Sequence, residues 1–170
     1  GATDPPPHML SVGTFYRARV LASDRAPSVP LTDLRGTHVA GGACAWIVGD
    51  RDFMEGQGYS PLGLEILGVG VTSDADHIIT PSTEGPRGSI RRALEDAGVS
   101  ADEITNWDLH ATATPGDYQE VRNLSAMVRD GVVVTARKGT FGHGMSCGGG
   151  WELLAQHLGL AEGRIHPTPL

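Results

Sequence analysis

Two similar units lie in the second half of the sequence, and each is a short apolar run followed by a polar loop that contains a histidine. In the first unit, Trp107 to Leu109 precede His110; in the second, Val132 to Val134 are expected to form a buried strand and precede a loop that ends at His143. Gly139 and Gly142 should let this loop turn sharply. A strand, a loop and a helix in this order are typical of α/β folds. Ligands bind in the loops at the carboxyl ends of strands in such folds, so we expect both imidazoles to reach one place.

The two histidines suit a site that stabilises negative charge. Each loop opens a helix, and the positive end of a helix dipole disfavours imidazolium, so we expect neutral rings that donate hydrogen bonds. Two such donors that converge on one oxygen form an oxyanion or enolate site. Either histidine by itself could equally be a polar loop residue or a core group with satisfied hydrogen bonds. The matched settings of His110 and His143 favour the functional interpretation.

A single lysine gives a separate indication. The chain has 13 Lys and Arg residues, and Lys138 is the only lysine among them. It lies in the same loop as His143. Because arginine serves every other cationic position, the lone lysine indicates a need for a compact ammonium group.

Hydrophobic periodicity and turn residues define the other expected elements. We expect further strands at 39–48 and at 62–71, the latter buried on at least one face, and helices at 11–22, about 90–97, 118–128 and 143–160. Residues 1–9 should be extended, without a local partner. Thr114 is a candidate helix cap with Pro115 at the first helical position, and Gly98 should end a helix. Glycines in the first turns of the last helix cost roughly 1 kcal/mol each relative to alanine, so a neighbouring backbone or an acyl chain should approach there.

Composition and spacing exclude several classes of protein. A net charge of -7 and a pI near 5.4 argue against a nucleic-acid surface. No apolar run reaches membrane-spanning length and nothing reads as a signal peptide, so the cytoplasm is the expected location. Cys44 and Cys147 are expected to be buried, reduced thiols. Asp74 and His77 could be mistaken for metal ligands, but no third ligand falls at a suitable spacing, so we expect no metal.

Several segments carry a resemblance to a known family. Residues 110–120, His-Ala-Thr-Ala-Thr-Pro-Gly-Asp-Tyr-Gln-Glu, resemble the His-Gly/Ala-Thr-x-Thr-Pro-x-Gly-Asp-x-x-Glu segment of β-ketoacyl synthases, the condensing enzymes of fatty acid and polyketide assembly. Residues 138–143 resemble the Lys-x-x-x-Gly-His segment of that family. Further similar segments at 41–45, 73–77 and 165–168 keep the family's order, so the resemblance covers nearly the whole chain.

The resemblance implies a thiolase-like layered α/β/α/β/α fold, of which this chain supplies mainly the C-terminal half. Residues 1–50 would be the end of the N-terminal ketosynthase half. Residues 51–170 would be the C-terminal half without its last strands and gating loop. The family's nucleophilic cysteine belongs to the N-terminal half, and neither Cys44 nor Cys147 falls at its motif.

The resemblance also assigns roles to site residues. His110 and His143 would hydrogen-bond the thioester carbonyl of a malonyl carrier protein and stabilise the enolate that forms on loss of carbon dioxide. Lys138 would hold the histidine geometry, acting through Glu120.

Carriers and partners follow from the same resemblance. Thr112 and Thr114 match threonines that bind the phosphopantetheine arm, although Thr114 could instead cap its helix. No cofactor would be bound permanently, since this arm of the acyl carrier protein carries the substrate. The expected partners are an N-terminal ketosynthase half or a complementary subunit, the acyl carrier protein, and a second subunit in a homo- or heterodimer. No nucleic acid or membrane is expected.

Three functions are compatible with these residues. The first is decarboxylative condensation of acyl and malonyl thioesters in fatty acid or polyketide biosynthesis. The second is a ketosynthase-like acyltransferase that forms an ester or an amide. The third is a non-catalytic, chain-length-factor-like partner subunit. Such partners commonly lose the first histidine, so His110 favours the first function.

Overall fold

The structure is a computed structural model that describes residues 1–23, 29–61, 63–77, 80–166 and 168. Its helices are α1 (Met9–Arg17), α2 (Arg51–Gly56), α3 (Glu84–Ala97), α4 (Gly116–Ser125), α5 (Lys138–Phe141) and α6 (Met145–Ala161), with a 3-10 turn η1 (Ala101–Glu103). Its strands are β1 (Ala2–Asp4), β2 (Gly42–Cys44), β3 (Asn106–Asp108) and β4 (Val133–Thr135). No helix within the described part of the chain is both long and apolar enough to cross a bilayer.

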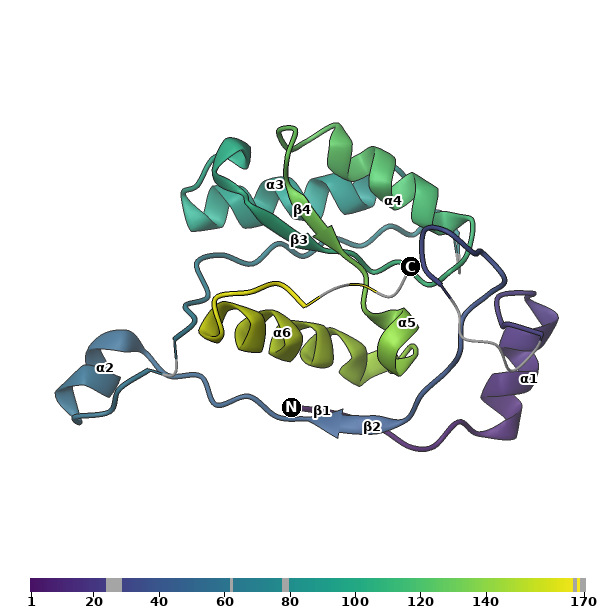
Figure 1. Cartoon of the computed structure of the whole chain (residues 1–170), viewed down its shortest axis with the longest axis horizontal. Coiled ribbons are helices and arrows are strands. Elements are labelled where there is room, and N and C mark those ends of the chain that lie inside the picture. Colours follow the sequence, from purple (N-terminus) through teal and green to yellow (C-terminus); the bar gives the residue numbers. More distant parts are fainter. Residues whose placement is uncertain (24–28, 62, 78–79, 167, 169–170) are drawn as a thin grey trace.

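The elements are stacked in layers (Figure 1). Helices α3 and α4 lie on one side of the β3–β4 pair, α6 lies on its other side, and the β1–β2 pair lies beyond α6. Sheets and helices therefore alternate, and the expected α/β layered fold is confirmed. Helices α1 and α2 stand apart from these layers.

The two faces of the β3–β4 sheet differ in chemistry. The strands run parallel, with Asp108 opposite Thr135. Because side chains alternate along a strand, Leu109 shares a face with Trp107, while Asp108 points to the opposite side. The apolar face forms the core of the protein with α4, through Leu109, Ala111, Leu124 and Ala136. The other face is polar and meets α6.

Three expectations about the second unit were wrong. The strand comprises Val133–Thr135 rather than 132–134, and its valines are not buried: Val133 is 45% and Val134 38% exposed. A sheet with only two described strands covers too little surface to bury both. Gly139 lies inside the short helix α5 instead of in a loop, whereas Gly142 does make the sharp turn, with φ of 80°.

The extended N-terminus finds a partner far along the chain. β1 pairs antiparallel with β2, and Ala2 lies opposite Cys44. Only Gly42–Cys44 of the strand expected at 39–48 is formed. A neighbour does approach the last helix closely here, but it is a side chain and not the predicted backbone: a Cβ at Gly150 would overlap the sulfur of Cys44.

The strand expected at 62–71 is absent from the described residues 63–71, and Leu62 lies outside them. Asp96 of α3 accepts a hydrogen bond from the Val69 amide (2.9 Å), and Arg92 of α3 donates to the Val71 carbonyl (2.6 Å). Val69 and Val71 are 61% and 71% exposed, so the predicted burial was also wrong. The backbone of this segment bonds to helix side chains because no described strand lies beside it.

Helix boundaries follow local capping. α1 begins earlier than expected because the His8 imidazole accepts the Leu10 amide hydrogen bond, and it ends at Arg17 rather than at 22. α3 ends before Gly98, which has φ of 67°, as predicted. α4 covers Gly116–Ser125 instead of 118–128, and α6 covers Met145–Ala161 instead of 143–160.

Candidate active site

The structure brings the two predicted histidines together. The rings of His110 and His143 meet edge to face, with centroids 5.1 Å apart and planes at 81°. His110 lies just past β3, and His143 lies between α5 and α6. The predicted convergence of the two imidazoles is therefore confirmed.

His143 is held by a segment that sequence reasoning did not connect with it. Its amide donates to the His38 carbonyl at 2.7 Å, and its carbonyl accepts from the Ala40 amide at 3.0 Å. Nδ1 of the His143 ring accepts a hydrogen bond from the Met145 amide at 3.2 Å. A neutral imidazole with an accepting Nδ1 carries its proton on Nε2, so this ring can donate from Nε2.

Both rings favour the neutral form. Burial, followed by the charge of Lys138 and the proximity of His143, lowers the pKa of His110 to about 4, even though the residue as a whole is exposed in this chain. Burial and the charge of Lys138 likewise lower the pKa of His143, against an opposing effect of Asp4. The neutral state was predicted, but its main cause is burial rather than a helix dipole.

Lys138 is buried, with 4% of its surface exposed, and it forms an ion pair with Glu152 of α6. We expected Lys138 to act through Glu120. This expectation was wrong, because the ion pair forms with Glu152. Burial is the main cause that raises the pKa of Glu152, against the hydrogen bond from Lys138. The signal for Glu152 was present in the sequence as an acidic residue among the apolar residues of a helix.

Glu120 has a different contact. Its Oε1 accepts a hydrogen bond from the His110 amide at 2.6 Å. Burial raises the pKa of Glu120, and hydrogen bonds from the His110 and Ala111 amides oppose this rise. Glu120 thus fixes the backbone of the first histidine directly, while the charge of Lys138 acts on it only from a distance.

Asp117 organises the loop after His110. Its carboxylate is 1% exposed and accepts hydrogen bonds from the amides of Thr112 (2.8 Å), Ala113 (3.0 Å) and the distant Leu31 (3.0 Å). Thr114 makes no side-chain cap, and Pro115 holds the cap position instead. The hydroxyls of Thr112 and Thr114 lie 3.0 Å apart. The capping alternative for Thr114 is therefore wrong, because no side chain caps this helix and the Thr114 amide itself donates to Asp117 at 3.4 Å.

Asp4 was not predicted as a site residue. Its carboxylate accepts hydrogen bonds from the Ser146 hydroxyl and from the Cys147 amide (3.2 Å) at the start of α6. The only sequence signal was an acidic residue before a proline run. Cys147 is buried as expected, but the expected burial of Cys44 was wrong, since it is only half-buried; neither forms a disulfide.

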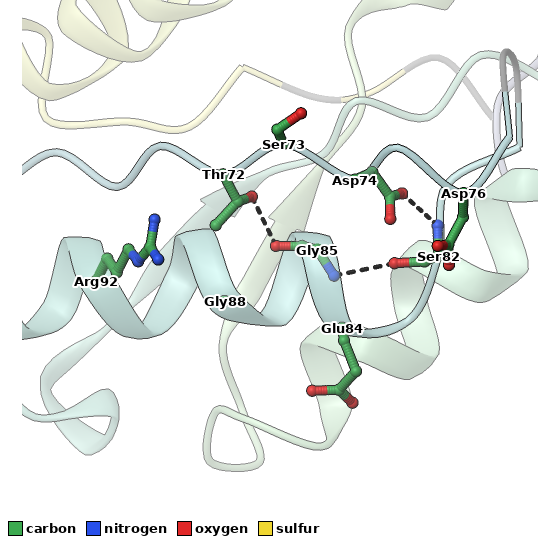
Figure 2. A pocket seen from close by; sticks show the side chains of 9 residues that line it. All are labelled: Thr72, Ser73, Asp74, Asp76, Ser82, Glu84, Gly85, Gly88 and Arg92. Carbon is green, nitrogen blue, oxygen red and sulfur yellow. Dashed lines mark hydrogen bonds between the residues drawn. The ribbon is translucent and has the colours of Figure 1, made fainter.

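The Asp74 loop forms an open cavity of about 360 Å³ beside α3 (Figure 2). The Asp74 carboxylate accepts the Ser82 amide hydrogen bond at 2.5 Å, and the Thr72 hydroxyl donates to the Gly85 carbonyl at 2.8 Å. Asp74 is therefore engaged in shaping its loop. Among the residues that the structure describes, no group of three or more His, Cys, Asp or Glu is arranged to hold a metal ion.

Comparison with known proteins decides the family. The model for the C-terminal domain of β-ketoacyl synthases matches residues 64–169. The chain belongs to the β-ketoacyl synthase family. The match leaves the predicted division at residue 50 untested, since it begins within the predicted C-terminal half.

Individual β-ketoacyl synthases agree with this assignment. The 3-oxoacyl-[acyl-carrier-protein] synthase 2 of Staphylococcus aureus is 29% identical, over 99% of this chain and 44% of that protein. The ishigamide ketosynthase/chain length factor structure is 28% identical with a TM-score of 0.84, over 99% of this chain and 41% of that chain. A type II PKS ketosynthase in complex with its acyl-carrier protein shares the fold, with 21% identity and a TM-score of 0.85, over 99% of this chain and 44% of that chain. The chain thus spans less than half the length of these relatives.

Proposed function

We propose that this chain supplies the decarboxylating part of a β-ketoacyl-acyl carrier protein synthase active site. The observation that carries the proposal is the contact between the imidazoles of His110 and His143, with centroids 5.1 Å apart. Burial lowers the pKa of both rings, which favours their neutral forms. Two neutral donors at this separation suit one developing oxyanion. The nucleophilic cysteine would come from an N-terminal ketosynthase half or a complementary subunit.

The reaction begins with an acyl group bound as a thioester to that cysteine. The histidines then hydrogen-bond the thioester carbonyl oxygen of the malonyl carrier protein. Loss of carbon dioxide leaves its electron pair in an enolate, and the two donors stabilise the negative oxygen. The enolate carbon attacks the acyl carbonyl; a carbon–carbon bond forms, the carbon–sulfur bond to the cysteine breaks, and the thiolate leaves.

Lys138 and its partners would support the histidines without contacting substrate. The charge of Lys138 lowers the pKa of both rings and so favours the neutral donors that the reaction needs. Glu152 compensates this buried charge, and Glu120 holds the His110 amide. This arrangement favours hydrogen-bond donation over proton transfer, because a ring with a pKa of about 4 is a weak base at neutral pH.

Thr112 and Thr114 would bind the phosphopantetheine arm of the acyl carrier protein. Their hydroxyls are half-buried in the loop that follows His110 and contact each other at 3.0 Å. Each hydroxyl can make a further hydrogen bond to an amide of the arm. The acyl carrier protein is accordingly the expected partner, together with a second subunit in a homo- or heterodimer.

The proposal is tested by carbon dioxide release from malonyl carrier protein. The chain is assembled with the portion that supplies the cysteine, and His110→Ala and His143→Ala are compared with the wild type. Each variant should lose release by on the order of 100-fold or more, because each removes one oxyanion donor. His166→Ala is the matched control; this histidine contacts Glu162 at 3.3 Å near the end of α6, and its loss should leave release unchanged.

Other outcomes separate the remaining functions. If both histidine variants release carbon dioxide as fast as the wild type, the condensing function is excluded. An assembly that forms without any release supports a chain-length-factor-like partner subunit. Transfer of an acyl group to an alcohol or amine without carbon dioxide release supports an acyltransferase.

A further inference from the structure

A second, largely buried polar cluster lies between the polar face of the β3–β4 sheet and α6. Its centre is an ion pair between Asp108, the last residue of β3, and Arg137, with Nε and Oδ2 2.9 Å apart. The side chains are 12% and 6% exposed. The proposed reaction assigns neither residue a role.

Gln156 of α6 joins this pair to both strands. Its Nε2 donates to Oδ2 of Asp108 and to the Thr135 hydroxyl, each at 3.0 Å. Its Oε1 accepts from the Asn106 amide group at 2.9 Å. The other oxygen of Asp108, Oδ1, is buried and has no hydrogen-bond partner among the described residues. The negative charge of Asp108 is therefore compensated there by the contacts of Arg137 and Gln156 with Oδ2.

The cluster shares its elements with the active site. Asp108 stands two positions before His110 on the same strand end, and Arg137 directly precedes Lys138. Gln156 lies one helical turn beyond Glu152, so both side chains are on one face of α6. A contact that ties Asp108 to Arg137 therefore sets the distance between the two chain segments that lead to His110 and Lys138.

The cluster is also coupled to the lysine site by charge. The Asp108 carboxylate raises the pKa of Glu152, and the Arg137 guanidinium lowers it, both as smaller effects than burial and the contact with Lys138. Two buried cations, Arg137 and Lys138, and two half-buried carboxylates, Asp108 and Glu152, thus lie together between sheet and helix. Removing one charge would leave an uncompensated charge close to Lys138.

Stability alone does not account for the pair. A buried ion pair is commonly no more stabilising than well-packed apolar side chains of similar size, because both charges lose their hydration. Its geometry, in contrast, is directional, since Arg137 and Gln156 must both reach the same carboxylate oxygen.

We propose that the Asp108–Arg137 ion pair, joined to α6 by Gln156, is a positioning device that holds the ends of β3 and β4 so that His110 and Lys138 keep their active geometry. This proposal rests on the proposed condensing function. Asp108 and Arg137 are positioning residues, because they act through His110 and Lys138 and do not contact substrate.

The test uses the assembled synthase and two variants. The double variant Asp108→Asn/Arg137→Gln removes both charges together, and Gln156→Met removes the bridge to α6 without leaving a buried charge. For each we measure kcat and KM for carbon dioxide release, normalised to the number of cysteines that can be acylated. We expect kcat to fall on the order of 10- to 100-fold with little change in KM, because small displacements of catalytic groups have effects of this size. Arg137→Lys keeps the charge but not the planar fork, and it should retain an intermediate kcat.

A purely structural role predicts a different result. It would lower the number of acylated sites and the melting temperature but leave kcat for each site unchanged, and that outcome overturns the proposal. If the double variant does not fold, the kcat of Gln156→Met for each acylated site decides between the two roles. The exposed pair Glu162 and Arg164 is the matched control, and Glu162→Gln/Arg164→Gln should change nothing. Absence of release in the wild type would instead count against the proposed function.

Discussion

The rings of His110 and His143 contact each other edge to face, with centroids 5.1 Å apart, although they follow different strands of the β3–β4 sheet. Parallel strands bring their carboxyl ends to the same edge, and both histidines lie near that edge. Lys138 is close enough to affect the pKa of each ring.

His110 should remain uncharged well below neutral pH. Its pKa is lowered from 6.5 to about 4, so the unfolded state binds more protons than the folded state between these values. The neutral His110 ring therefore makes its full contribution to the free energy of unfolding above pH 6.5, and this contribution is lost as the pH falls towards 4. Glu120 and Glu152, whose pKa values are raised, act in the opposite direction, so the comparison must be made between wild type and His110→Gln. The stability of wild type relative to His110→Gln should therefore fall on acidification from pH 6.5 towards 4.

Titration of the His110 ring by NMR checks this directly. The resonance is assigned as the one that disappears in His110→Gln. A midpoint near 4 is expected, and a midpoint at or above 6.5 would contradict the neutral site.

Lys138→Met should destabilise the protein by about 3 to 5 kcal/mol, because it leaves the Glu152 carboxylate buried without its cation. The double variant Lys138→Met/Glu152→Gln should recover much of this loss, since it removes both charges. Urea unfolding of wild type, both single variants and the double variant measures the coupling. Additive effects of the two substitutions would show that the pair is not energetically linked.

Asp117→Asn should loosen the loop after His110. The amide side chain has only one accepting oxygen, so it cannot receive all the hydrogen bonds that the carboxylate accepts from Leu31, Thr112 and Ala113. A loss of about 2 to 4 kcal/mol is expected. Hydrogen exchange at the Thr112 and Ala113 amides should accelerate. Asp130→Asn, at an exposed position, serves as the control, and equal exchange in both variants would refute the role of Asp117.

Neighbouring glycines of α6 should respond differently to alanine. A Cβ at Gly149 would meet nothing within 4 Å, so Gly149→Ala should stabilise the helix by up to about 1 kcal/mol. A Cβ at Gly150 would overlap the Cys44 sulfur, so Gly150→Ala should separate β2 from α6 and lower the melting temperature. Similar melting temperatures for the two variants would mean that β2 does not pack this closely.

Features that depend on neighbouring residues in the chain could be read from the sequence. The end of α3 at Gly98 is one case, because a left-handed residue after a helix favours glycine whatever lies around it. The turn at Gly142 before His143 is another. The two histidine loops were found for the same reason, since an apolar run followed by polar and glycine residues describes a strand end locally.

Features that depend on distant neighbours could not be read in this way. The segment 62–71 has the composition of a buried strand, yet strand formation needs a second strand to accept its hydrogen bonds, and the described residues provide none. The partner of Lys138 is a further case. Glu120 and Glu152 are both acidic residues downstream of a histidine, and only the placement of α6 brings Glu152 to the ammonium group.

The sequence by itself determined the family, the two imidazoles and the importance of the lone lysine, because these depend on residue identity and short-range spacing. Tertiary structure alone decided which carboxylate compensates Lys138, that Asp4 binds the start of α6, and that Asp108 and Arg137 meet across two strands. The physical reason is that charge pairing and desolvation depend on distances between elements. Those distances are set when sheet and helix pack against each other.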